Sequence, residues 1–154
     1  MKNIFPLAVV LSVIFIISCG ENDTGHPGAV LKTRADSLLN DVMDGHNIGM
    51  GKMGRLTRAE QTTRRLLDSV AKLPANAYKV AEPLKIKLDS LQKELSYAEF
   101  AMNKWMDEFN ADSAVDNPKD RINYLEDEKR KITKVKEAIL GSLQKADSLL
   151  KGKF

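Results

Sequence analysis

The fold is decided by the stretch LKIKLDSLQKELSYAEFAMNKWMDEF at residues 84–109. Its apolar positions alternate steps of four and three, which is the spacing of an amphipathic helix packed against other helices. The positions on this face are Leu84, Leu88, Leu91, Leu95, Ala98, Met102, Trp105 and Phe109. Further large apolar side chains near Trp105 are Tyr97, Phe100 and Met106. We therefore expect a middle helix with its core nucleus at the C-terminal end.

The stretch before this helix, residues 29–73, is a second helix candidate. It contains no proline, its apolar residues recur at helical spacing, and Pro74 ends it. Residues 74–82 are then a connector. Pro83 is expected at the first position of the middle helix, where the missing N–H group would have no partner in any case.

The stretch after the middle helix, residues 118–151, predicts a third helix. Asn117 and Pro118 supply a cap and a first-turn proline, and Gly152 ends the helix. Its apolar face is formed by Ile122, Leu125, Ile132, Ile139, Leu143, Ala146 and Leu150, with Lys129 and Lys136 at two more positions and Val135 beside them. Because short turns join consecutive helices in antiparallel directions, residues 29–154 predict an all-α, antiparallel three-helix bundle.

Four glycines interrupt the first helix candidate within residues 45–54. Each glycine costs about 1 kcal/mol relative to alanine in a helix interior. Two structures are compatible with this. The helix continues with a kink, where a missing side chain lets a neighbour approach closely, or it breaks and the bundle has four segments. We expect the kinked helix.

The same part of the chain carries three methionines and a histidine on one helix face. They are Met43, His46, Met50 and Met53. Their spacing places them within about 80° of one another. Thioether and imidazole ligands suit Cu(I), and Met102 and Met106 of the middle helix could complete such a copper site. The same residue types ligate haem iron. The alternative is that these methionines fill core gaps beside the glycines and that no cofactor is bound.

The N-terminus has the layout of a secretory signal over residues 1–18. Lys2 precedes an apolar run at residues 4–17, and these 14 residues are too few to span a bilayer, which requires ~20. The run ends at the chain's single cysteine, Cys19, in the motif Ile16-Ile17-Ser18-Cys19. This motif resembles the bacterial lipobox, which implies cleavage before Cys19 and acylation of its thiol. With one cysteine, the mature chain has no internal disulfide.

Residues 19–28 are polar and contain glycine, and we interpret them as a flexible tether. Acyl chains contribute about 0.8 kcal/mol per buried methylene, so two or three of them hold a protein at a membrane. We therefore expect a lipid-anchored protein of the bacterial envelope, at the periplasmic face or the cell surface. Glu21 and Asp23 resemble surface-export signals of Bacteroidetes lipoproteins, and the turn residue Ser113 resembles their O-glycosylation acceptor.

Composition and the absence of known motifs argue against nucleic-acid binding and enzyme activity. The chain is 43% hydrophobic and 29% charged with a net charge of +3, which is typical of a folded protein and too near neutral to indicate nucleic-acid binding. The sequence has no glycine-rich phosphate loop, nucleophile elbow or His-Glu-x-x-His motif. His46 is the one histidine outside the tether, so no histidine pair is available for acid–base catalysis, and we expect no enzyme activity. A structural or protein-interaction role and Cu(I) binding are the two hypotheses.

Several of these residues together resemble a family of small Bacteroidetes lipoproteins often labelled "viral A-type inclusion protein". The matching positions are Val42-Met43, His46, Met50 and Met53, then Met102-x-x-Trp105-Met106-x-x-Phe109, then Tyr124-Leu125-Glu126-x-Glu128 with Ile132 and Val135. The resemblance covers most of the predicted bundle. It implies a helical envelope lipoprotein without an assigned activity.

Overall fold

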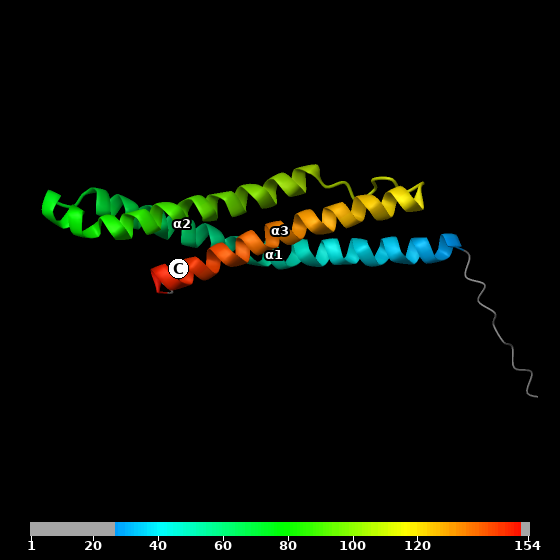
Figure 1. Ribbon diagram of the computed structural model, residues 1–154, viewed down its shortest axis with the longest axis horizontal. Coiled ribbons are helices and arrows are strands. Elements are labelled where there is room, and N and C mark those ends of the chain that lie inside the picture. Colours follow the sequence, from blue (N-terminus) through cyan, green and yellow to red (C-terminus); the bar gives the residue numbers. More distant parts are fainter. Residues whose placement is uncertain (1–26, 152–154) are drawn as a thin grey trace, which may run out of the picture.

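Three α-helices make up the computed structural model, which describes residues 27–151 (Figure 1). They are α1 (Pro27–Ala71), α2 (Ala75–Glu108) and α3 (Pro118–Leu150). Consecutive helices run antiparallel, and each helix packs against both of the others. The predicted all-α three-helix bundle is therefore confirmed. The signal, Cys19 and most of the tether lie outside the described residues.

The helices are staggered, so the bundle is an elongated rod. Figure 1 shows all three helices overlapping in the middle, whereas α2 extends beyond the end of α3 at one end and α3 extends beyond α2 at the other. A small second core joins α1 to α3 at this latter end, built on Ala35, Ile122 and Leu125. At the opposite end, the α1–α2 hairpin projects without α3.

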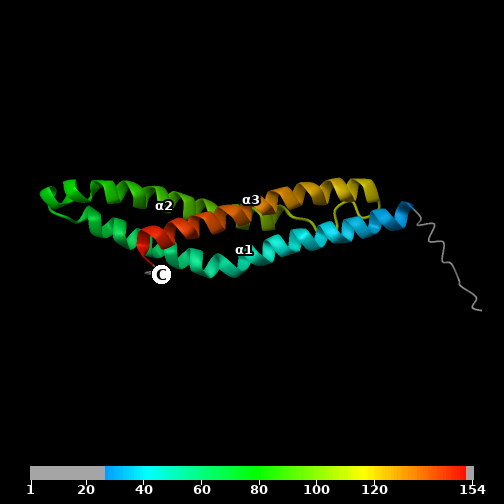
Figure 2. The same ribbon diagram turned by 60° about the horizontal axis from the view of Figure 1, so that its bottom comes forward.

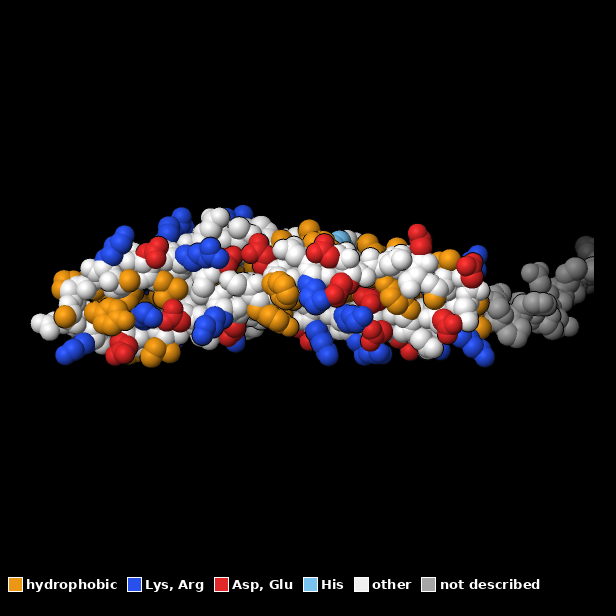
Figure 3. Space-filling view, turned by 90° about the horizontal axis from the view of Figure 1, so that it is seen from above, with side chains coloured by type: hydrophobic (Ala, Val, Ile, Leu, Met, Phe, Trp, Pro, Cys, Tyr) orange, Lys and Arg blue, Asp and Glu red, His pale blue; other side chains and the backbone are white. Residues whose placement is uncertain are grey.

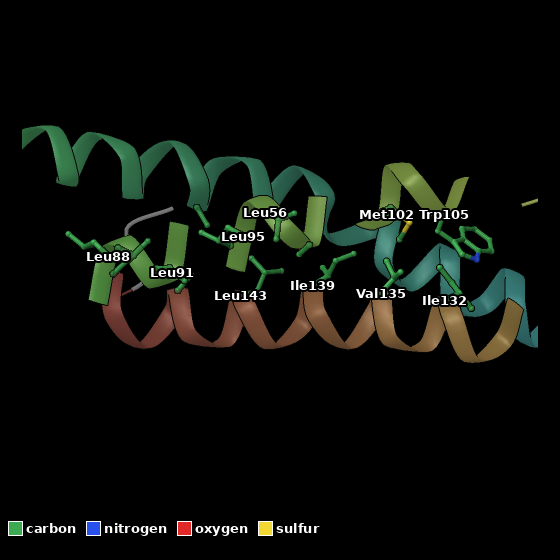
Figure 4. Packing of buried hydrophobic residues seen from close by; sticks show 14 of the residues in the cluster. Leu56, Leu88, Leu91, Leu95, Met102, Trp105, Ile132, Val135, Ile139 and Leu143 are labelled. Atoms are coloured by element: carbon green, nitrogen blue, oxygen red, sulfur yellow. The ribbon is translucent and has the colours of Figure 1, made fainter. Parts of the chain in front are cut away.

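The main core follows the predicted face of α2 from Leu88 to Trp105 (Figure 4). Every position of this face between these two residues is buried. Leu84 is exposed, because the first turns of α2 lie beyond the end of α3. Tyr97 and Phe100 are 63% and 61% exposed. The prediction that these two aromatic residues help to nucleate the core is therefore wrong.

The middle helix begins earlier than predicted. It starts at Ala75, so Pro83 lies inside α2 rather than at its first position, and the predicted connector is helical. Tyr78 donates its backbone N–H to Pro74 O over 2.8 Å, and Tyr78 and Ala81 pack against the main core. This packing outweighs the one backbone hydrogen bond that an internal proline removes.

Helix α1 is continuous through its glycine-rich part, and Figure 2 shows it bent between its two halves. A Cβ on Gly45 would lie 3.1 Å from Ile132 Cγ2, and one on Gly49 would lie 2.4 Å from Met102 Cε. These two glycines therefore allow α2 and α3 to approach α1 closely. The four-segment alternative is wrong.

The ends of α3 follow the sequence prediction closely. Asn117 Oδ1 accepts hydrogen bonds from the backbone N–H groups of Lys119 (3.1 Å) and Asp120 (3.3 Å), as a helix cap does. Lys151 ends the helix in the left-handed conformation, with φ of 50°. Within residues 27–151, no helix has both the length and the apolar character needed to span a membrane.

Candidate functional site

The Met/His face of α1 lies at the border between the core and the surface. Met43 and Met50 are exposed, whereas His46 and Met53 are half-buried, and Met53 packs against the main core. The imidazole of His46 lies against the indole of Trp105, with 5.5 Å between the ring centroids. Its Nδ1 is 3.2 Å from Asn47 Oδ1.

Of the two candidate ligands on α2, Met102 lies in the contact with α1. Met102 is fully buried against Gly49, whereas Met106 is exposed. In the described part of the chain, no three His, Cys, Asp or Glu side chains gather as metal ligands, so the copper hypothesis depends on thioethers. It stays a prediction. Cu(I) titration of the full chain tests it, and uptake that is unchanged in His46→Ala would rule out the proposed ligand set.

A buried glutamate that the sequence analysis missed joins α3 to α2. Trp105 Nε1 donates to Glu128 Oε2 over 2.9 Å, and Lys131 Nζ donates to Glu128 Oε1 over 2.8 Å. Hydrogen bonds to Asp127 and Glu128 raise the pKa of Lys131. Glu128, rather than the predicted Lys129, occupies the buried position between Leu125 and Ile132, and Lys129 is exposed. Glu128 follows Leu125 by three residues, which is one of the two spacings expected for the buried face of a helix.

Aromatic rings extend this cluster toward the α2–α3 turn. The Trp105 and Phe109 rings stack with 4.7 Å between centroids, and the Phe109 and Tyr124 rings with 6.3 Å. Tyr124 Oη accepts a hydrogen bond from the backbone N–H of Asn110 over 2.8 Å. Ser113 lies in this turn, outside the helices, and its carbonyl oxygen accepts from Arg121 Nη1 over 2.8 Å. This end of α2 is therefore fixed to α3 by rings and hydrogen bonds.

A second polar cluster lies in the contact between α1 and α2. Glu60 is buried, and its Oε1 accepts from Ser96 Oγ (2.5 Å), Arg64 Nη2 (2.7 Å) and Gln92 Nε2 (2.9 Å). Burial opposes ionisation of Glu60, but the hydrogen bonds from Ser96 and Arg64 outweigh it and lower the pKa of this carboxyl. Burial and the neighbouring Glu60 carboxylate raise the pKa of Glu99. The two carboxyls therefore favour opposite protonation states.

The outer contact between α2 and α3 is open. A hollow of about 390 Å³ and an adjoining one of about 250 Å³ share Tyr97 as a wall and form what we term the α2–α3 groove. The groove is defined by Lys93, Tyr97, Phe100, Lys104, Lys134 and Ala138. Two carboxylates, Glu94 and Glu108, also line it, and each forms an ion pair with a lysine of this chain. A third hollow of about 590 Å³ continues the line past Glu94 and Lys145, which form an ion pair over 2.7 Å. Figure 3 shows apolar side chains in the middle of the molecule with lysine or arginine side chains directly beside them.

Comparison with known proteins gives no further assignment, because no family model, curated protein or solved structure matches the chain. Among the features above, the Glu128 and Glu60 clusters hold helices together, whereas the α2–α3 groove presents aromatic and basic side chains to the solvent.

Proposed function

We propose that this chain is a lipid-anchored protein of the bacterial envelope whose three-helix bundle serves as an interaction module. The anchor is supported by the position of Cys19 at the end of a signal-like apolar run. The resemblance to small Bacteroidetes envelope lipoproteins supports the same location. We expect no nucleic-acid partner, since the net charge is near zero.

The rod shape suits a module that reaches away from a membrane. Helix α1 begins at Pro27, shortly after Cys19, so an acylated Cys19 would hold this end of the rod near the bilayer. The 45 residues of α1 correspond to a straight helix of about 67 Å. The α1–α2 hairpin would then project from the membrane, with the α2–α3 groove partway along.

The observation that carries the interaction role is the exposure of Tyr97 and Phe100 beside an open groove. These two side chains are 63% and 61% exposed. Aromatic side chains are enriched at protein–protein interfaces, where burial of each ring contributes a large apolar area. Exposed aromatic residues that line a groove therefore favour a binding role over a purely structural one.

Intact-mass analysis and cell fractionation of the full chain, expressed in a bacterium that processes lipoproteins, test the anchor. We expect the mass of acyl chains on an N-terminal Cys19 and recovery in the membrane fraction. Cys19→Ala should abolish both, whereas Asn22→Ala in the tether should change neither. An unmodified N-terminus at any other residue would contradict the proposal.

A further inference from the structure

We propose that the α2–α3 groove binds an acidic amphipathic helix of a partner protein. This inference rests on the proposed function as an interaction module and names the surface and the chemistry of the partner. Helix-in-groove recognition requires an elongated apolar groove with anchors at helical spacing and charges that match the flanks of the incoming helix. The groove provides each of these.

The shape of the groove fits a helix. Tyr97 and Phe100 are three residues apart on α2 and form one wall, while the half-buried Ala101 and Ala138 form the floor. Small floor residues let an incoming helix approach closely, so that its apolar side chains can pack against the two rings. With the third hollow, the line of hollows runs beside α2 from Lys87 to Glu108, which corresponds to about 30 Å of helix.

The charge of the groove selects an acidic partner. Lys104 and Lys131 each pair with carboxylates of their own helix. By contrast, neither Lys93 nor Lys134 has an ion-pair partner among the described residues, and both are exposed. A helix with Asp or Glu on both sides of its apolar face would place carboxylates beside these two free ammonium groups.

The same lysines argue against a second copy of this chain as the occupant. In a symmetric dimer, each groove would face its own image, because such an interface uses the same patch on both subunits. A second copy would bring no unpaired carboxylate to Lys93 and Lys134, because Glu94 and Glu108, which line the same hollows, already pair with Lys145 and Lys104. A different, acidic protein is therefore the better match.

Gly141 offers a way to obstruct the groove without disturbing the core. By helical spacing it lies on the same face of α3 as Ala138 and Lys145, and a Cβ at this position would meet no atom within 4 Å. Gly51 in α1 is equally unobstructed. Gly141→Phe and Gly51→Phe are therefore a matched pair, since both add a ring to an open helix position and only the first adds it at the groove.

The experiment measures binding of a labelled peptide to the full chain in nanodiscs of neutral lipid. The probe is a helical peptide of about 18 residues with leucines at i, i+3, i+4 and i+7 spacing and glutamates elsewhere. The comparison peptide has lysine in place of every glutamate. We expect binding of the acidic peptide alone, weakened about tenfold or more by Gly141→Phe and by the double variant Lys93→Glu, Lys134→Glu. Gly51→Phe should bind as the wild type does.

Several results would overturn this inference. Equal binding of both peptides, no binding, or undiminished binding by Gly141→Phe would each do so. Association with vesicles of phosphatidylglycerol that Lys93→Glu abolishes, without peptide binding, would assign the groove to lipid instead. Self-association that Gly141→Phe abolishes would assign it to a second copy. If Cys19 is acylated but the peptide does not bind, the anchor proposal holds and the groove proposal fails. If the peptide binds to a chain that is not acylated, the groove proposal holds and the anchor proposal fails.

Discussion

The two sides of α2 differ in how completely neighbouring side chains cover them. Toward α1, Gly49 brings the helix backbone against Met102, and the buried Glu60 carboxylate accepts hydrogen bonds from two α2 side chains. Along the outer edge toward α3, Tyr97 and Phe100 remain in solvent beside a groove. One helix thus has a closed side that fixes the bundle and an open side that remains available for binding. Substitutions on the two sides should therefore have very different effects on stability.

The largest difference is expected between truncation of Met102 and truncation of Tyr97. Met102→Ala removes a fully buried side chain and leaves a cavity, which should lower the free energy of unfolding by about 2–5 kcal/mol. Tyr97→Ala removes a mostly exposed ring and should change it by less than about 0.5 kcal/mol. Urea unfolding followed by circular dichroism measures both. Equal losses would mean that the α2–α3 groove is closed in solution.

The next effect comes from adding a side chain on the closed side. In Gly49→Leu, the new Cβ would collide with Met102 Cε and lie 3.3 Å from Ile139 Cδ1, so overpacking should destabilise the bundle by about 1–3 kcal/mol. Gly51→Leu enters open space and should stabilise α1 by up to about 1 kcal/mol through helix propensity. If both variants were stabilised, the close α1–α2 approach would be refuted.

A smaller, pH-dependent effect is expected from the carboxyl pair on the closed side. The raised pKa of Glu99 means that the folded state binds its proton more tightly than the unfolded state. The stability from Glu99 is therefore present below its unfolded pKa and is lost as pH rises through the folded one. Glu60 has a lowered pKa, so its contribution is present above the unfolded value and lost as pH falls.

Glu99→Gln separates the two carboxyls, because its amide can donate to Glu60 at any pH. The wild type loses the contribution of Glu99 as the pH rises, but the variant does not. The difference in unfolding free energy, variant minus wild type, should therefore increase by about 1 kcal/mol from pH 4.5 to pH 7. Urea unfolding at the two pH values measures the gain, and Glu137→Gln on the exposed face of α3 is the control. A gain confined to the acidic value would show that Glu99 is not the group that loses its proton in the folded state.

Sequence periodicity predicted the closed side better than the open one. The spacing from Leu88 to Trp105 identified the buried positions of α2, because burial against two neighbours requires an uninterrupted apolar face. Spacing from Leu125 allows either Glu128 or Lys129 at the buried position, and the choice depends on the indole N–H of Trp105 as a partner from another helix. The predicted helix start at Pro83 was wrong for a related reason. Tyr78 and Ala81 pack against the core, and this packing keeps the chain helical on both sides of the proline.

The candidate site was harder to predict than the fold. The Met/His spacing placed four residues on one face of α1 but gave no information about how deeply each would be buried. The α2–α3 groove had no local signal, since large aromatic residues such as Tyr97 and Phe100 are typical of a core, and their exposure beside α3 is known only from the structure. The glycines of α1 correctly indicated a close approach of a neighbouring helix. However, the sequence around Gly49 and Gly51 is alike, and only the structure shows that a Cβ would meet other helices at Gly49 and open space at Gly51.

The smallest effect is expected from the ion pair that crosses the open side. Lys145 Nζ and Glu94 Oε2 are 2.7 Å apart, but their side chains are 63% and 34% exposed. Exposed pairs of this kind contribute about 0–1 kcal/mol, and salt screens them. Lys145→Gln should therefore lower the unfolding free energy by less than about 1 kcal/mol, and the difference from wild type should vanish near 1 M NaCl. A larger, salt-independent loss would mean that this pair holds α2 and α3 together and is not a weak surface contact across the open side.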